Sequence, residues 1–249
     1  MRPPAIRRLA PVVVIALTLA AAPAPAAAQR LPTVRALLDG HATAVGGVER
    51  WRQVTTREDV GAGIFDGEPA RFVARWMADG RRWAIVYDFP DTTQVWHGYD
   101  GATAWFESIY GETTRLVGAD SLNYALAADI AGALAPIGPR DSATVDGDTL
   151  FDGRPSWRLR IVHDGGVPRT YFFEKATGLR IGEIAPNASG ARTTTISAWR
   201  TVDGLVVPAR WTVVSRTTTR SFVAEQTRFG VALDPGVFRA PTIAGIWGP

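Results

Sequence analysis

Hydrophobic and polar side chains alternate with a period of two along most of the chain. From 71 to 76 Phe72, Ala74 and Trp76 point one way while the intervening side chains point the other. This alternation is typical of β-strands that bury one face. The same pattern starts at Thr55 and recurs at 83–89, 157–162, 169–174, 179–184, 194–202, 206–215 and 219–229.

Two segments follow a helical period instead. The first covers 33–45, where Thr33 is a suitable N-cap and Gly46-Gly47 a suitable stop. The second covers 119–137, which Asp120 or Ser121 can cap and Pro136 can end. Its apolar positions at helical spacing are Leu122, Leu126, Ile130 and Leu134. We expect this second helix to be amphipathic.

Asp-Gly pairs separate the strand-like runs. This dipeptide favours the positive φ angles of two-residue hairpin turns, so consecutive strands should pair antiparallel. The pairs are Asp66-Gly67, Asp79-Gly80, Asp100-Gly101, Asp146-Gly147, Asp152-Gly153, Asp164-Gly165 and Asp203-Gly204. The pattern predicts a mostly β (α+β) fold. We expect a curved, unclosed antiparallel β barrel with two or three helices on its concave side.

The first 28 residues have the three-part layout of a secretory signal peptide. Arginines precede an apolar stretch over 11–22, and small residues at 26–28 form a cleavage site. The apolar stretch is shorter than the roughly 20 residues that span a bilayer. We therefore predict export to the periplasm, a single mature domain over 29–249, and no membrane span in the mature protein.

Charge and cysteine content exclude several classes of protein. Three of the 27 basic residues precede residue 29, which leaves 24 basic against 24 acidic residues. A near-neutral chain without a clustered basic patch argues against a nucleic-acid partner. The chain has no cysteine. Disulfides, a thiolate nucleophile and an acylated N-terminal cysteine are thus excluded, and the fold must depend on its apolar core.

The sequence carries no pattern typical of catalysis. The three histidines, His41, His97 and His163, lack the short spacing of metal ligands. No Gly-x-Ser-x-Gly sequence supplies a serine nucleophile. We predict a protein that is not an enzyme and that needs no cofactor or metal. Folding can still bring the histidines together, so a hydrolase built around His97 or His163 stays an alternative.

Four short motifs resemble one known family. They are Ala44-Val45-Gly46-Gly47, Gly98-Tyr99-Asp100-Gly101 with Trp105, Tyr171–Glu174 leading to Thr177–Leu179, and Trp199–Pro208. In this order they resemble the outer-membrane lipoprotein-sorting, or lipoprotein-carrier (LolA/LolB-like), proteins of the bacterial periplasm. The resemblance implies an unclosed β barrel whose helices form a lid over an apolar cavity. It also implies a role in holding acyl chains.

The functional prediction is a non-catalytic periplasmic binding protein or carrier for an acyl chain, a lipid or a lipoprotein. Tryptophans on strands and leucines on the second helix are the candidates for lining its cavity. The predicted lining residues are Trp83, Trp96, Trp105, Leu122, Leu126 and Ile130. The alternative is an envelope sensor or scaffold that binds another envelope protein through a free sheet edge.

Overall fold

The computed structural model describes residues 30–130, 134, 137–164, 166–188, 190–241 and 243–247, the last range by its backbone alone. The predicted signal peptide over 1–28 lies outside the described residues. The described elements belong to one unit, Leu31–Pro249. None of the helices described is both long and apolar enough to cross a membrane.

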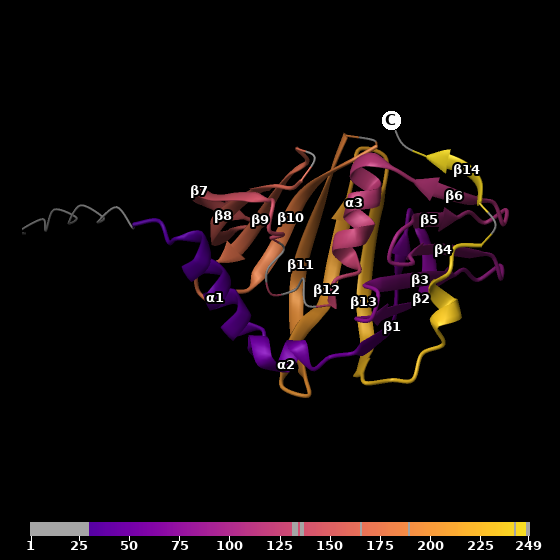
Figure 1. Ribbon diagram of the computed structural model, residues 1–249, viewed down its shortest axis with the longest axis horizontal. Helices are drawn as coiled ribbons and strands as arrows, with labels where there is room; N and C mark the ends of the chain where they lie inside the picture. Colours follow the sequence, from indigo (N-terminus) through magenta and orange to yellow (C-terminus); the bar gives the residue numbers. More distant parts are fainter. Residues whose placement is uncertain are drawn as a thin grey trace, which may run out of the picture. The chain divides into compact units, whose positions relative to one another are not determined.

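The described residues of this unit form three α-helices and fourteen strands (Figure 1). The helices are α1 (Val34–Ala44), α2 (Val48–Arg52) and α3 (Gly118–Ala127), with a short 3-10 helix η2 (Pro235–Phe238). The first strands are β1 (Thr56–Phe65), β2 (Glu68–Met77), β3 (Arg82–Asp88), β4 (Gln94–Tyr99), β5 (Ala104–Glu107) and β6 (Thr113–Leu116). The others are β7 (Ser142–Phe151), β8 (Arg154–Val162), β9 (Pro168–Glu174), β10 (Arg180–Asn187), β11 (Gly190–Val202), β12 (Leu205–Val214), β13 (Thr219–Phe229) and β14 (Ile243–Trp247).

All strands form one sheet, in the order β14-β6-β5-β4-β3-β2-β1-β13-β12-β11-β10-β9-β8-β7. Neighbours pair antiparallel, except that β14 adds to β6 in parallel. The two ends of this order, β14 and β7, do not pair, so the sheet stays open. The predicted fold class is confirmed: a mostly β, unclosed antiparallel sheet with three helices.

The Asp-Gly turns form largely as the sequence predicts. Asp66, Asp152 and Asp203 have φ angles of 54°, 50° and 49°, each followed by a glycine of positive φ, as two-residue hairpins require. The prediction of a turn at Asp146-Gly147 is wrong, because both residues lie inside β7. There the register against β8 shifts, so the glycine forms a β-bulge instead of a turn.

Irregular register also bends other strands. The pairing of β11 with β12 shifts twice between Ile196 and Trp199, and the pairing of β1 with β13 shifts after Val60. Each extra residue increases the local twist of its strand. Long strands that bend in this way let the sheet curve around the helices, so it does not stay flat.

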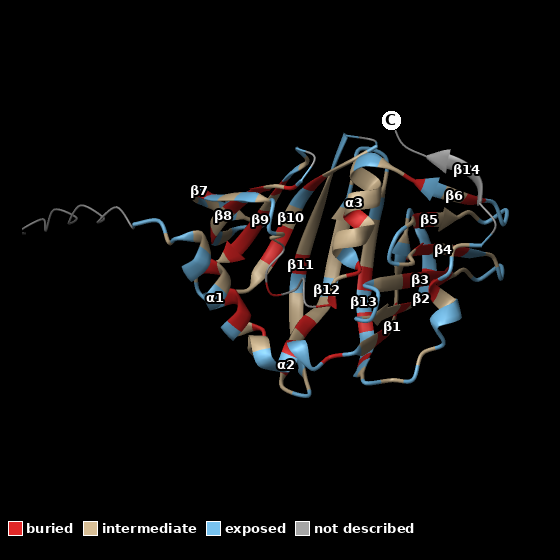
Figure 2. Cartoon of the chain, in the orientation of Figure 1, coloured by how far each residue is buried: buried red, intermediate tan, exposed pale blue. Residues whose placement is uncertain are grey.

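The first helix forms as predicted. The Thr33 side chain accepts a hydrogen bond from the Ala36 amide at 3.1 Å, and the helix ends before Gly46. Leu37 packs against a cluster from β8 and β9 that includes Leu159 and Phe173. The buried residues of α1, which Figure 2 colours red, are Leu37, His41 and Ala42, and their helical spacing puts them on one side of the helix. Burial of this stripe fixes α1 against one end of the sheet.

The second helix, α3, is shorter than expected. Its N-cap is Val117, without a side-chain hydrogen bond, so the prediction of a cap at Asp120 or Ser121 is wrong. Asp120 lies in the first turn, and its carboxylate accepts the Ala188 amide of the β10–β11 turn at 3.2 Å. The expected end at Pro136 lies outside the described residues. Ile130 follows α3 and is buried.

Candidate ligand-binding cavity

A cavity of about 690 Å³ lies between the helices and the sheet. This volume falls within the roughly 300–1,000 Å³ of small-molecule pockets. Five of the nine tryptophans line it, together with leucines and isoleucines. The tryptophans are Trp51, Trp76, Trp83, Trp199 and Trp211. They come from α2, β2, β3, β11 and β12, so the apolar wall is assembled from distant parts of the chain.

Four of the six predicted lining residues face the cavity. Trp83 comes from the sheet, and Leu122, Leu126 and Ile130 come from α3 and the residues after it. Contact with a ligand remains a prediction for these residues. Trp76, Trp199 and Trp211 also line the cavity, although the sequence reasoning did not select them.

The placement expected for Trp96 and Trp105 is wrong. Trp105 is 1% exposed, and its indole donates to the Phe238 carbonyl at 3.3 Å, on the other face of the sheet. A Cβ on Gly98 would meet the Trp105 ring at 2.3 Å, so the indole covers that glycine. The Trp96 indole donates to Gln94 Oε1. His97 points toward α3, and side chains alternate along a strand. Its neighbours in β4, Trp96 and Gly98, therefore face the opposite side of the sheet, where the Trp105 ring covers Gly98.

Hydrogen bonds fix α3 over the cavity from both sides. The Trp76 indole donates to the Ala127 carbonyl at 2.9 Å, and Asn123 Nδ2 donates to the Pro186 carbonyl at 2.8 Å. Arg169 donates to Asn123 Oδ1 from within the cavity. In this structure α3 is therefore an anchored helix over the cavity, with Asn123 as its buried residue.

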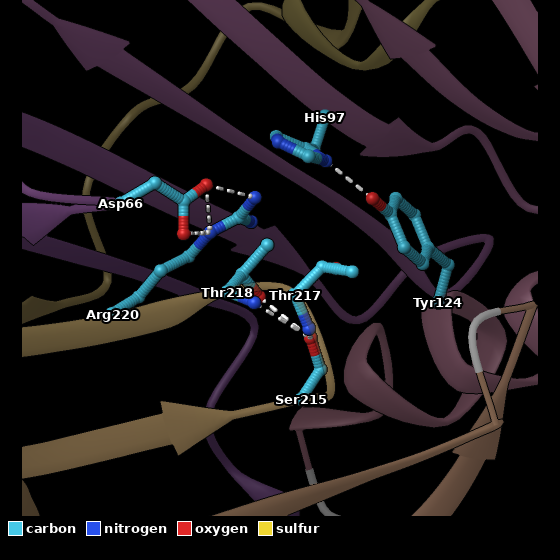
Figure 3. A network of polar contacts seen from close by, with 7 residues as sticks. All are labelled: Asp66, His97, Tyr124, Ser215, Thr217, Thr218 and Arg220. Atoms are coloured by element: carbon cyan, nitrogen blue, oxygen red, sulfur yellow. Dashed lines mark hydrogen bonds and ion pairs between the residues drawn. The ribbon is translucent and has the colours of Figure 1, made fainter.

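A third anchor joins α3 to β4. The Tyr124 hydroxyl and His97 Nδ1 share a hydrogen bond (Figure 3). The Tyr87 ring packs edge-on against His97 with 5.7 Å between ring centroids. Burial, with a smaller contribution from the Arg220 charge, lowers the pKa of His97 to about 3. The imidazole is therefore held neutral near pH 7, as a structural partner of Tyr124.

We expect Asn123→Ala to loosen α3. The substitution leaves the Pro186 carbonyl and one Arg169 donor without a partner, which costs about 1–3 kcal/mol for buried polar groups. Urea unfolding should show this loss, and hydrogen exchange should show faster exchange in α3. Ser121→Ala on the same helix is the control and should change neither measurement. Equal protection of α3 in both variants would contradict the anchoring role.

One end of the cavity is charged. Arg169, Arg180 and Arg192 line it with a single adjacent carboxylate, Glu183. Glu183 lies 3.5 Å from Arg169 Nη1 and 3.8 Å from Arg192 Nη2. Burial raises the pKa of Glu183, but the three arginines and His163 outweigh it, so this pKa lies below its usual value. Glu183 is therefore ionised at neutral pH.

Sequence reasoning missed these arginines, although one signal was present. Arg169 lies two residues before Tyr171 and four before Phe173 in β9, and both aromatic side chains are fully buried. Period-two geometry puts Arg169 on the same face as these rings. An arginine on the buried face of a strand is unusual and indicates a partner within the fold.

Two histidines also line the cavity. His41 Nδ1 lies 3.1 Å from the Gly178 carbonyl, and His163 Nδ1 lies 2.8 Å from Asp141 Oδ2. Asp141 also accepts the Gly138 and Asp164 amides at 2.7 and 2.9 Å. These contacts order the loop before β7. Across the part of the chain that the structure describes, no group of three or more metal-binding side chains gathers.

Together, the fold and cavity define an open, strongly curved β sheet that encloses an apolar, partly charged space beneath a helix. Solved structures share this fold. They include a putative outer membrane lipoprotein-sorting protein domain from Vibrio parahaemolyticus, with 12% identity, coverage of 82% of this chain and 94% of that chain, and a TM-score of 0.53.

Two further structures match similarly. A LolA superfamily protein from Nitrosomonas europaea is 10% identical over 84% of this chain and 98% of its own, with a TM-score of 0.55. A DUF1329 family protein from Desulfovibrio piger ATCC 29098 is 15% identical over 83% of this chain and 97% of its own, also with a TM-score of 0.55. The resemblance to lipoprotein-sorting proteins is thus confirmed as a shared fold. No family model and no curated protein matches the sequence.

Proposed function

We propose that the protein is a periplasmic, non-catalytic binding protein or carrier for an acyl chain, either of a free lipid or of a lipoprotein. The observation that carries the proposal is the cavity of about 690 Å³ walled by five tryptophans and by the apolar side of α3. Because the sheet is open and curved, its own side chains do not fill the space beneath α3. A hydrocarbon tail bound there removes apolar surface from water on both sides of the contact.

The cavity bears on the alternatives. A scaffold that only presents a sheet edge needs no space of this size in its interior, whereas a carrier does. For a hydrolase, His97 is unsuited as a general base near neutral pH, since its pKa is lowered to about 3. His163 is oriented by Asp141, but its Nε2 is buried without a hydrogen-bond partner among the described residues. We therefore favour binding over catalysis.

The test is uptake of a fluorescent fatty acid by the purified protein, with native mass spectrometry of any lipid that co-purifies. Leu126→Asp places a charge on the apolar wall, and because Leu126 is only partly buried the fold should survive. A buried, unpaired carboxylate is costly. We expect Leu126→Asp to weaken fatty-acid binding by about tenfold or more, which is roughly 1.4 kcal/mol.

The matched control is Ser121→Asp, a carboxylate added to the same helix away from the cavity lining. It should bind the fatty acid as the unmodified protein does. If the unmodified protein takes up no fatty acid and carries no lipid, the proposal is wrong. Export is tested separately, by locating the protein in periplasmic extracts with and without residues 1–28.

A further inference from the structure

The charged end of the cavity has more positive than negative charge. Three guanidinium groups, which stay protonated in proteins, face one carboxylate. The other carboxylates on the wall already have cationic or imidazole partners, as in the pairs Asp59 with Arg57 and Asp129 with Arg81. These carboxylates are therefore not available to neutralise the group formed by Arg169, Arg180 and Arg192.

The hydrogen bonds of these arginines are also incomplete. Arg169 is 4% exposed, and it donates to the Tyr171 hydroxyl at 3.1 Å and to Asn123, yet its Nε has no partner among the described residues. The Nε of Arg192 is likewise buried and unpartnered. Buried donors without acceptors are rare in folded proteins and call for an explanation.

Arg180 has still fewer contacts. Its guanidinium lies over the Tyr171 ring, 5.6 Å from the centroid. Among the described residues it takes part in no hydrogen bond and no ion pair. Stacking on an aromatic ring orients a guanidinium while leaving its donors free. Arg180 therefore lines the cavity with its hydrogen-bonding groups available.

Neighbouring strands bring the three arginines together. They come from β9, β10 and β11, which lie side by side in the sheet (Figure 1). The planar fork of each guanidinium matches the oxygens of a carboxylate or a phosphate. The apolar wall and this charged end belong to the same cavity.

We propose that the end of the cavity formed by Arg169, Arg180 and Arg192 binds the anionic headgroup of the ligand, a carboxylate or a phosphate, while its hydrocarbon tail lies against the tryptophan wall. This inference rests on the proposed function and narrows the ligand to anionic amphiphiles. Glu183 lies beside the arginines but balances only one of their three positive charges, and the incoming anion supplies further negative charge.

The experiment compares three probes with the same tail: hexadecanoate, hexadecyl phosphate and hexadecanol. Displacement of a fluorescent fatty acid gives the affinity of each for the full mature protein. At least one anion should bind about tenfold or more tightly than the neutral alcohol, as expected for charge-assisted hydrogen bonds in a cavity. Which anion binds more tightly distinguishes a fatty-acid carboxylate from a lipid phosphate.

Arg180→Gln is the main variant, because Arg180 makes no polar contact that the fold depends on, and Arg192→Gln is the second. Each should remove most of the preference for the anion and leave hexadecanol affinity unchanged. Arg140→Gln, on an exposed arginine outside the cavity lining, is the control and should keep the preference. Circular dichroism and melting temperature verify that each variant is folded.

The outcomes separate the two proposals. If all three probes bind equally well, the headgroup site is wrong and the carrier proposal stands. If the anions are preferred but Arg180→Gln and Arg192→Gln both keep that preference, the assignment to these arginines is wrong. If no probe binds, the proposed function fails and the headgroup site fails with it.

Discussion

Gly46→Ala is expected to lower the free energy of unfolding by about 3 kcal/mol or more. Gly46 has a φ of +106°, and an added Cβ would lie 2.4 Å from the Gly204 carbonyl oxygen. Both the backbone conformation and the clash are unfavourable for alanine. For a chain of this size, 3 kcal/mol corresponds to a fall of roughly 6–12 °C in melting temperature, which differential scanning calorimetry measures.

Gly47→Ala is the matched control. Gly47 also has a positive φ, +92°, but no atom lies within 4 Å of an added Cβ. This variant therefore has backbone strain alone, about 1–2 kcal/mol. If the two variants lose the same stability, the close approach of Gly46 to Gly204 is not what makes Gly46 necessary.

Acid is expected to destabilise the protein through His97. Its pKa is lowered to about 3 in the folded state, against about 6.5 for an unperturbed histidine. Between these values the unfolded chain binds a proton that the folded protein excludes. The contribution of His97 to the free energy of unfolding is thus fully present above about pH 6.5. It falls by about 1.4 kcal/mol for each pH unit below that value, which gives a loss of roughly 2 kcal/mol at pH 5.

Urea unfolding of the unmodified protein and of His97→Gln, followed from pH 7 to pH 5, measures this contribution. Glutamine does not titrate, and it retains groups that can hydrogen-bond the Tyr124 hydroxyl. The titratable and charged groups near position 97 are Tyr87, Tyr124 and, by its charge, Arg220, which pairs with Asp66 at 2.9 Å. The variant should show a shallower dependence on pH. Parallel curves for both proteins would contradict the assignment.

The resemblance motifs show how local signals combine in the fold. The glycines at 46–47 and the turn Asp203-Gly204 are each readable as local stops or turns. In the structure they meet, because Val206 donates to the Val45 carbonyl at 3.0 Å and Gly46 packs on Gly204. The Gly178 carbonyl contacts His41 of α1 at 3.1 Å. Residues of three of the motifs, around Gly46, Gly178 and Gly204, thus contact one another or α1 and hold the first two helices against the sheet.

The sequence by itself determined many of the strands, most of the hairpins and α1, because alternation, Asp-Gly turns and a threonine cap are local properties that need no partner. It predicted no strand at β6, β7 or β14. It also determined that α3 presents Leu122 and Leu126 on one side. The face that each strand buries was decided by the tertiary structure. A period of two permits either face, and only the structure shows that Trp83 lines the cavity while Trp105 lies on the other face of the sheet.

Only the tertiary structure decided what the cavity contains. Arg169, Arg180 and Arg192 lie on three consecutive strands, but the sequence did not show that all three side chains line one cavity. Pairing of β9, β10 and β11 brings them to one wall, and curvature from the bulges leaves a space before them. The residue types are local properties of the sequence, but this binding site depends on which face of each strand turns inward and on how the sheet curves, and both are set by the tertiary structure.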